Sequence, residues 1–228
     1  MPKHGKKYRE LKAKVTEDMY TLADAVKLLK ETNPSKFDAS CELHMRLGVD
    51  PRHADQTVRA TVALPHGTGK KLRVIAIVGE DQIAAVKEVG AMEVGSEDLI
   101  DKIAKGFTDF DVAVATPAMM PKLGKVAKTL GQKGLMPSPK AGTVSDKPVE
   151  VVAEIIKGKV EFRTDKTGII HNIFGKVSFG EEQLLENLKT LIKAIQDEKP
   201  SGVKGTYIKA VHLATTMGPS ITIDIKSL

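Results

Sequence analysis

Polar and apolar residues alternate in two stretches in the first third of the chain. In residues 40–47 every second side chain is apolar, and a similar run follows at 58–64. A period of two is typical of a strand with one buried and one polar face. The polar face of the first strand carries Glu42 and His44, which are near enough to interact, although such neighbours are usually structural.

Helical signals precede these strands. The first fifteen residues hold six Lys or Arg side chains and predict a basic arm that leads into a short helix. Thr21 and Asp24 have the spacing of a capping box, with Asp24 in place of the usual Glu. The helix that they start is expected to stop near Asn33 and Pro34.

The pattern changes in the middle of the chain. Nearly continuous apolar runs occupy residues 72–78 and 112–115, and a shorter one lies at 92–94. Helical periodicity accompanies them at 80–89, 96–105 and 147–157. Buried strands that alternate with helices predict βαβ units and a parallel sheet.

After Gly158 the alternating pattern returns. We expect a long amphipathic helix at 181–197. Four strands are expected, at 160–163, 169–173, 206–215 and 220–225. The simplest architecture for the whole chain is α/β with two domains, one of them inserted into the other.

The domain boundaries follow from these patterns. Residues 1–66 and 159–228 form a discontinuous two-layer α/β domain built from both chain ends, and residues 67–158 form an inserted Rossmann-like domain with a parallel sheet. Two chain crossings side by side are expected to act as a hinge.

Charge separates the two predicted domains. The 228-residue chain has a net charge of +6, and residues 67–158 carry 13 basic and 12 acidic side chains against 22 and 17 in the flanking segments. We therefore place the main surface for a polyanion on the discontinuous domain. Aromatic residues make up only 4% and Trp is absent, which favours structured RNA or duplex over a stacked single strand.

A lysine-rich segment lies within the inserted domain. Residues 121–144 hold five lysines, four glycines, three prolines and no acidic side chain. Lysines without carboxylate partners favour an external anion such as phosphate, and a solvated helix and loop is the alternative. Because acidic side chains elsewhere in the inserted domain balance this charge, we expect the segment to be a secondary surface.

Catalytic and cofactor chemistry has no support in the sequence. Cys41 is the only cysteine, and the six histidines show no paired metal-ligand spacing. The glycine-lysine segment at 66–71 fails the Walker pattern, and no Gly-x-Gly-x-x-Gly follows 72–78. The charged N-terminus has no apolar stretch behind it, so we expect no secretory signal, and no apolar run approaches the about 20 residues that cross a bilayer. We expect a cytoplasmic protein without metal, cofactor, membrane partner or enzymatic activity.

Three short segments carry residue types suited to RNA. Residues 35–38 combine an aromatic ring with a cation, 163–168 form a turn rich in donors for phosphate and ribose, and 215–219 join threonine hydroxyls, a thioether and glycine. Glycine lets RNA approach the backbone, Met offers an apolar surface, and Thr hydroxyls can bond the 2′-OH. The alternatives are a core position for Phe37 and a plain hairpin turn at 163–168.

Two other functions stay open on these residues. The inserted domain permits an enzyme or a nucleotide sensor, although a fold alone licenses no function. Sequence-specific DNA binding is the other, and the chain lacks a helix-turn-helix, zinc-finger or basic-zipper pattern.

The segments taken together resemble one family. LGQKGLMPSPKAGTV at 130–144 resembles the signature of the ribosomal protein L-one family, and further matches occur in order at 35–38, 47–70, 163–171 and 215–220. The departures are small: Gln132 and Lys133 stand where Pro-Arg is common, and Ser138 and Thr164 stand where Asn is common.

This resemblance implies a structural protein of the large ribosomal subunit. The implied partners are the ribosomal RNA of the mobile side stalk, exit-site tRNA, whose release it assists, and the mRNA of its own operon, whose translation it represses. Off the ribosome a monomer is expected. Carried over by motif, the rRNA-binding residues are Lys36, Phe37, Ser40, Glu42, Arg163, Asp165, Lys166, Thr167, Gly168, Thr215, Thr216, Met217 and Gly218.

The N-terminal arm adds RNA-backbone contacts in the same comparison, through His4, Lys6, Lys7 and Tyr8. Glu42 and Asp165 are acidic, so we assign them to contacts with hydroxyls or bases, or to the positioning of basic side chains.

Overall fold

The computed structural model describes residues 5–227, apart from the side chains of residues 54, 140 and 227. The chain divides into two compact units. Unit 1 comes from both ends of the chain, up to Gly69 and from Glu161 onward, and unit 2 is Lys70–Val160. Both crossings lie a few residues later than the sequence predicts. Near the two crossings, Lys70 pairs with Asp111 at 2.7 Å and Lys159 pairs with Glu154 at 2.8 Å, so both cations contact carboxylates of unit 2.

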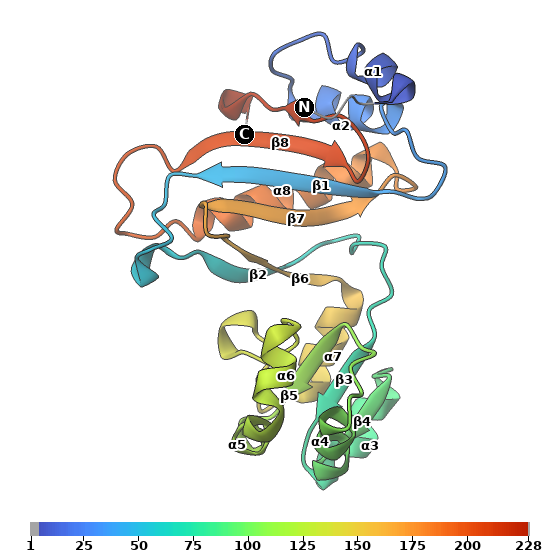
Figure 1. Cartoon of the computed structure of the whole chain (residues 1–228), viewed down its shortest axis with the longest axis vertical. Coiled ribbons are helices and arrows are strands. Elements are labelled where there is room, and N and C mark those ends of the chain that lie inside the picture. The colour runs from blue at the N-terminus through green and yellow to red at the C-terminus, as the bar shows by residue number, and fades with distance from the viewer. Residues whose placement is uncertain (1–4, 228) are drawn as a thin grey trace. The chain divides into compact units, whose positions relative to one another are not determined.

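Unit 1 is built on an antiparallel sheet with the strand order β7-β1-β8-β9. The strands are β7 (Ile169–Lys176), β1 (Ser40–Leu47), β8 (Ile208–Thr215) and β9 (Ile221–Thr222). Two helices, α2 (Leu22–Glu31) and α8 (Glu181–Asp197), pack against one face of this sheet, and α8 runs behind the strands in Figure 1. No described helix of unit 1 covers the face turned toward the viewer, which we call the open face.

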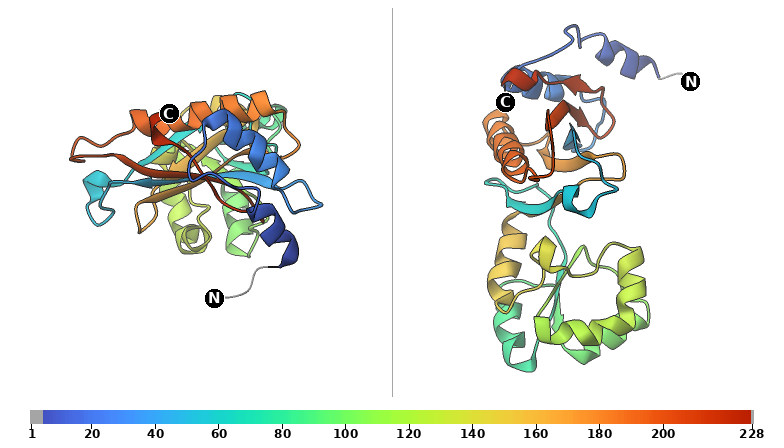
Figure 2. Two further views of the ribbon diagram at one scale, coloured as in Figure 1. Left: turned by 90° about the horizontal axis from the view of Figure 1, so that it is seen from above. Right: turned by 90° about the vertical axis from the view of Figure 1, so that its left-hand side faces the viewer.

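The alternating pattern of β1 explains this arrangement. Cys41, Leu43 and Met45 are fully buried under the helices, so their polar neighbours stand on the open face. Helix α8 meets the buried face with apolar side chains three or four residues apart, including Leu184, Leu188, Leu191 and Ile195. Figure 2 shows the two layers from other directions.

The predicted start of α2 is confirmed with one difference. The Thr21 hydroxyl oxygen accepts a hydrogen bond from Asp24 N at 3.3 Å, as a helix cap should. The Asp24 carboxylate, however, accepts from the Thr21 hydroxyl at 2.7 Å rather than from the Thr21 backbone.

Smaller elements complete unit 1. Helix α1 (Lys6–Lys12) lies in the N-terminal arm, and β2 (Arg59–Ala63) pairs with β6 (Lys159–Arg163) as a two-stranded sheet. Single 3-10 turns occur at Ala54–Gln56 and Ile225–Ser227.

Unit 2 contains a parallel sheet with the order β4-β3-β5, made of Glu93–Gly95, Val74–Ile77 and Val112–Ala115. Alternate residues of β3 enter two separate cores. Ile75 and Ile77 pack with α4 (Glu97–Ala104), α5 (Met120–Leu123) and α6 (Ala127–Gln132), whereas Val74 and Ala76 pack with α3 (Ile83–Glu88) and α7 (Pro148–Lys157). The expected α/β class is confirmed.

The lysine-rich segment is more broken than the sequence suggests. Instead of one helix, it contains α5 and α6 joined by a 3-10 turn at Gly124–Val126, with a further turn at Pro139–Ala141. Another 3-10 turn, at Pro117–Met119, comes directly before α5. Proline and glycine weaken the regular helical ladder at these points. A 3-10 turn at Glu80–Gln82 likewise replaces the start of the helix expected at 80–89.

Candidate nucleic-acid interface

The turn after β8 is joined to the start of β1. Thr216 N donates to Ser40 O at 3.1 Å, and Ser40 N donates to the Thr216 hydroxyl at 3.2 Å. The same hydroxyl lies 3.3 Å from Glu42 Oε1. Hydrogen bonds therefore bring three of the expected RNA-binding residues together from opposite ends of the chain.

Two large apolar side chains stand out beside this junction. Phe37 is 59% exposed and Met217 is 61% exposed. They line a hollow of about 560 Å³, together with Gly5, Tyr8, Pro34, Ser35, Thr216 and Gly218. A core position for Phe37 is therefore wrong. An exposed ring and thioether offer a surface on which a base or ribose can pack.

The two remaining residues of the turn have a structural role. Thr215 is 2% exposed, and its hydroxyl oxygen has no hydrogen-bond partner within the described residues. A Cβ added at Gly218 would lie 2.2 Å from that oxygen, so only glycine fits there. The sequence assigns all threonine hydroxyls of this turn to RNA, but the hydroxyl of Thr215 lies beneath the surface that Thr216 and Met217 form.

The second cluster is the turn between β6 and β7. The Asp165 carboxylate accepts hydrogen bonds from Thr167 N, the Thr167 hydroxyl and Ile169 N, each at 2.8 Å. Burial opposes the charge of Asp165, but these hydrogen bonds outweigh it and lower its pKa to about 2. Gly168 has φ +77°, a conformation that favours glycine. Asp165 thus shapes the turn and remains an anion.

Arginine and lysine side chains gather around this turn. The side chains of Arg163 and Lys166 are exposed and make no hydrogen bond or ion pair within the described part of the chain. With Arg59 and His171 they line a hollow of about 630 Å³, whose other lining residues are Pro51, Thr57, Thr164 and Asp165. Cations that lack internal partners suit phosphate.

Sequence reasoning missed Arg59 and His171. Arg59 pairs with Glu161 on the neighbouring strand at 2.5 Å, and His171 follows the predicted turn by three residues. Only the pairing of β2 with β6, together with the antiparallel register of β7, brings both side chains to the hollow. The motif RTDKTGIIH contains His171, so its match with the family was the available signal.

The structure describes three of the four residues that the sequence analysis assigns to the N-terminal arm. His4 lies outside the described residues. Lys6, Lys7 and Tyr8 belong to α1, and Tyr8 lines the hollow beside Phe37. The Lys7 ammonium donates to Pro34 O, so this cation also attaches the arm to the loop before β1.

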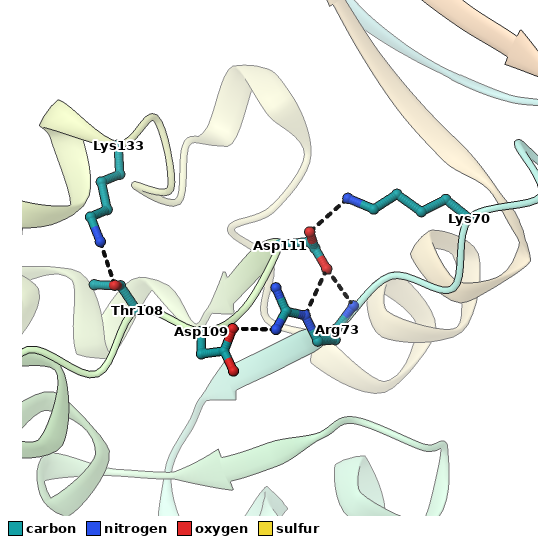
Figure 3. A network of polar contacts seen from close by, with 6 residues as sticks. All are labelled: Lys70, Arg73, Thr108, Asp109, Asp111 and Lys133. Atoms are coloured by element: carbon teal, nitrogen blue, oxygen red, sulfur yellow. Dashed lines mark hydrogen bonds and ion pairs between the residues drawn. The ribbon is translucent and has the colours of Figure 1, made fainter. Parts of the chain in front are cut away.

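Several cations of unit 2 are bound internally. Asp111 accepts from Lys70 and from Arg73, and these hydrogen bonds lower its pKa to about 2 (Figure 3). Figure 3 also shows Asp109 beside Arg73 and Lys133 beside the Thr108 hydroxyl.

The lysine-rich segment follows the same trend in part. Lys122 lies 2.6 Å from Glu97, and Lys133 donates to Thr108. The absence of acidic residues from 121–144 therefore did not leave all its lysines unpaired, because Glu97 of α4 pairs with Lys122 and the Thr108 hydroxyl accepts from Lys133 in the folded chain.

The described residues also bear on a metal site and a reactive thiol. Within residues 5–227, no group of His, Cys, Asp or Glu side chains has the arrangement of a metal site. Burial raises the pKa of Cys41 to about 12, so its thiol is not a nucleophile at neutral pH. Among the described helices, none has the length and apolar character needed to span a membrane.

Comparison with known proteins adds the family. The model of the ribosomal protein L1p/L10e family matches residues 29–219. The large ribosomal subunit protein uL1 of Chloroflexus aggregans is 52% identical over 230 residues, covering 99% of this chain and 97% of the relative. The protein of the same name from Thermus thermophilus is 49% identical over 226 residues, covering 98% of this chain and 99% of the relative.

The family model matches most of the chain, and about half of the residues are identical to those of the two relatives over nearly the full length. The chain belongs to the ribosomal protein L1p/L10e family of non-enzymatic structural proteins of the large ribosomal subunit.

Proposed function

We propose that unit 1 binds the ribosomal RNA of the side stalk in the large subunit, and that it does so in the cytoplasm as a monomer before assembly. The RNA-binding surface consists of two clusters. The first is the Phe37–Met217 cluster with Lys36, Ser40, Glu42 and Thr216, which Thr215 and Gly218 support from beneath. The second is the 163–168 turn with Arg163, Asp165, Lys166, Thr167 and Gly168.

One observation carries this proposal. The Thr216 hydroxyl bonds the backbone of Ser40 and lies beside Glu42, so two segments more than 170 residues apart in sequence form one rigid junction. Beside that junction, Phe37 and Met217 are more exposed than a structural role requires. Preformed polar geometry next to exposed apolar side chains is what recognition of folded RNA through ribose and base needs.

The test is Met217→Asp. A carboxylate here would repel the phosphates of RNA and remove an apolar contact, while the exposed position leaves the fold intact. We expect the Kd for a side-stalk RNA fragment in a filter-binding assay to rise by about tenfold or more.

Met92→Asp is the matched control, since Met92 is 51% exposed in unit 2. It should leave the Kd unchanged. Equal affinity of the Met217→Asp variant and the unmodified chain would remove the 215–218 turn from the RNA site.

Two further activities belong to this proposal by family. We infer that the chain assists release of deacylated tRNA from the exit site, and that it represses its own operon by binding an mRNA structure similar to the rRNA site. Repression is tested by translating the operon mRNA in vitro with added protein. The Met217→Asp variant should fail to repress if both RNAs use one surface, and equal repression by both proteins would contradict this.

The tRNA role calls for a separate experiment. Ribosomes reconstituted without the chain should lose labelled tRNA from the exit site at a changed rate, and adding the chain back should restore that rate. If ribosomes that lack the chain and ribosomes that contain it release tRNA equally fast, the chain has no part in this step.

A further inference from the structure

Three histidines form a row across the open face of unit 1. His171 on β7, His44 on β1 and His212 on β8 are directly opposite one another in the strand register. His44 Nδ1 and His171 Nδ1 are 2.8 Å apart, so the two rings share a hydrogen bond. His212 instead contacts the Thr222 hydroxyl at 3.3 Å.

Carboxylates flank the first two rings. Glu42 Oε2 lies 3.6 Å from His44 Nε2, and Asp165 Oδ2 lies 3.5 Å from His171 Nε2. The four groups therefore form a continuous chain, Glu42–His44–His171–Asp165, which we call the proton relay. Its two ends belong to the two clusters that we propose as the RNA site.

Proton counting shows what the relay lacks. Two neutral imidazoles hold two N–H groups, one of which is used between the Nδ1 atoms. One of the two outer Nε2 atoms then carries no hydrogen, so its lone pair faces the negatively charged carboxylate beside it. A single added proton gives both Nε2 atoms a hydrogen for their carboxylates and keeps the central bond. A second added proton would place hydrogens on both Nδ1 atoms and break that bond.

We propose that the relay takes up one proton when RNA binds across the open face, so that His44 and His171 belong to the RNA interface and couple affinity to pH. This inference rests on the RNA binding proposed for unit 1. An RNA that touches both clusters must pass over the relay, because the relay connects them.

The surrounding charges favour this coupling. In the free chain burial lowers the pKa of His44, and its neighbour His171 lowers it further, so His44 is mostly neutral at neutral pH. A phosphate nearby stabilises the protonated pair and raises its pKa on binding. The other charged or titratable groups toward this region are Arg46 on β1, His212 on β8, and Arg59, Arg163 and Lys166 around the second hollow.

The direction of the effect follows. The pair binds its proton more tightly in the complex than in the free chain. The affinity for RNA is therefore highest at pH values below the pKa of the free pair. It declines as the pH rises from there through the pKa of the complex. For one proton the slope is at most about tenfold in Kd per pH unit, and imidazole chemistry places it between about pH 5 and 8.

Calorimetry tests the proposal with the full chain and a side-stalk rRNA fragment. Titrations in two buffers of different ionisation enthalpy count the protons taken up on binding. We expect the uptake to be largest, at up to one proton per complex, between the pKa of the free pair and the pKa of the complex, and to fall away on both sides. Gln at position 44 and Asn at position 171 can still form hydrogen bonds but cannot be protonated. The double variant His44→Gln/His171→Asn has neither imidazole and should therefore bind RNA without proton uptake.

His66→Gln is the matched control. His66 also faces a carboxylate, because its Nε2 lies 2.7 Å from Glu186 Oε2. Glu186, however, belongs to α8, which packs on the covered face of the sheet. This variant should keep the proton uptake of the unmodified chain.

Three results would overturn the inference. Tight binding without proton uptake overturns it and leaves the proposed function intact. Uptake that persists in the double variant places the titrating group elsewhere, for example on the RNA, and also overturns it. Failure of the unmodified chain to bind at any pH overturns both proposals.

Discussion

Adjacent threonines in the 215–218 turn differ in the use of their hydroxyl groups. The Thr216 hydroxyl is bonded to Ser40 and Glu42 at the surface, whereas that of Thr215 is buried without a partner in the described residues. Sequence motifs could not separate the two, because burial depends on the strand register and on the close approach of Gly218. The difference leads to a prediction for each residue.

Thr216→Val should cost about 1 kcal/mol of unfolding free energy and weaken RNA binding about fivefold, since it removes hydrogen bonds that hold the junction. Thr215→Val keeps the side-chain shape and removes an unpaired hydroxyl, so its stability should be equal or up to about 1 kcal/mol higher, with unchanged RNA affinity. Urea denaturation and filter binding measure both. Weaker binding by the Thr215 variant would show that its hydroxyl reaches RNA.

A second prediction at this scale concerns Asp165. Hydrogen bonds from its own turn lower its pKa from the ordinary 3.8 to about 2. A lowered pKa in the folded state contributes stability above the unfolded value, which is lost as pH falls through the folded value. Asp165→Asn should therefore be less stable than the unmodified chain at neutral pH, and the difference should shrink between about pH 4 and 2.

Denaturant unfolding at a series of pH values measures this difference. A gap between the two proteins that stays constant down to about pH 2 would mean that the carboxylate charge does not stabilise the turn.

At the scale of elements, one polar residue stands out on the buried face of α8. Asn187 is fully buried among leucines. Its side-chain nitrogen donates to Gly67 O and Phe174 O, each at 2.9 Å, and its oxygen accepts from His66 N at 3.1 Å. The helix is thereby attached both to β7 and to the segment where the chain leaves unit 1.

Asn187→Leu should destabilise unit 1 by about 1–3 kcal/mol, because the three backbone groups lose their partner in a dry environment. Thermal unfolding followed by circular dichroism would show the lower midpoint. Lys189→Leu, at an exposed position of the same helix, should change stability little. Equal midpoints for the two variants would contradict an anchoring role for Asn187.

The elements themselves were largely predictable. Period-two alternation found β1, and the apolar run at 112–115 coincides with β5. Strands β3 and β5 of the parallel sheet are largely buried on both faces, which explains their continuous apolar character. Asn187 could not be predicted, because nothing local distinguishes a buried asparagine from an exposed one on a helix.

At the scale of the whole molecule, the division of the chain makes its own prediction. Unit 1 has its own core and contains every described residue of the proposed rRNA site. A chain in which a short linker replaces residues 70–160 should therefore fold and bind the side-stalk RNA fragment with nearly full affinity. Residues 70–160 alone should bind it weakly and without specificity.

Circular dichroism establishes folding of each part before binding is measured. A shortened chain that folds cooperatively and does not bind rRNA would place essential contacts in unit 2, and the lysine-rich segment would then be the first candidate.

The sequence by itself determined the class of the fold, the insertion of one unit into the other and the family. Periodicity reports which faces are buried, and motifs keep their order along the chain, so both can be read without coordinates. The tertiary structure alone decided which motif residues reach the surface together. Phe37 stands exposed, Thr215 lies buried, Lys122 is paired, and His44 meets His171 across two strands. Each of these depends on contacts between segments distant in sequence, and no local pattern encodes such contacts.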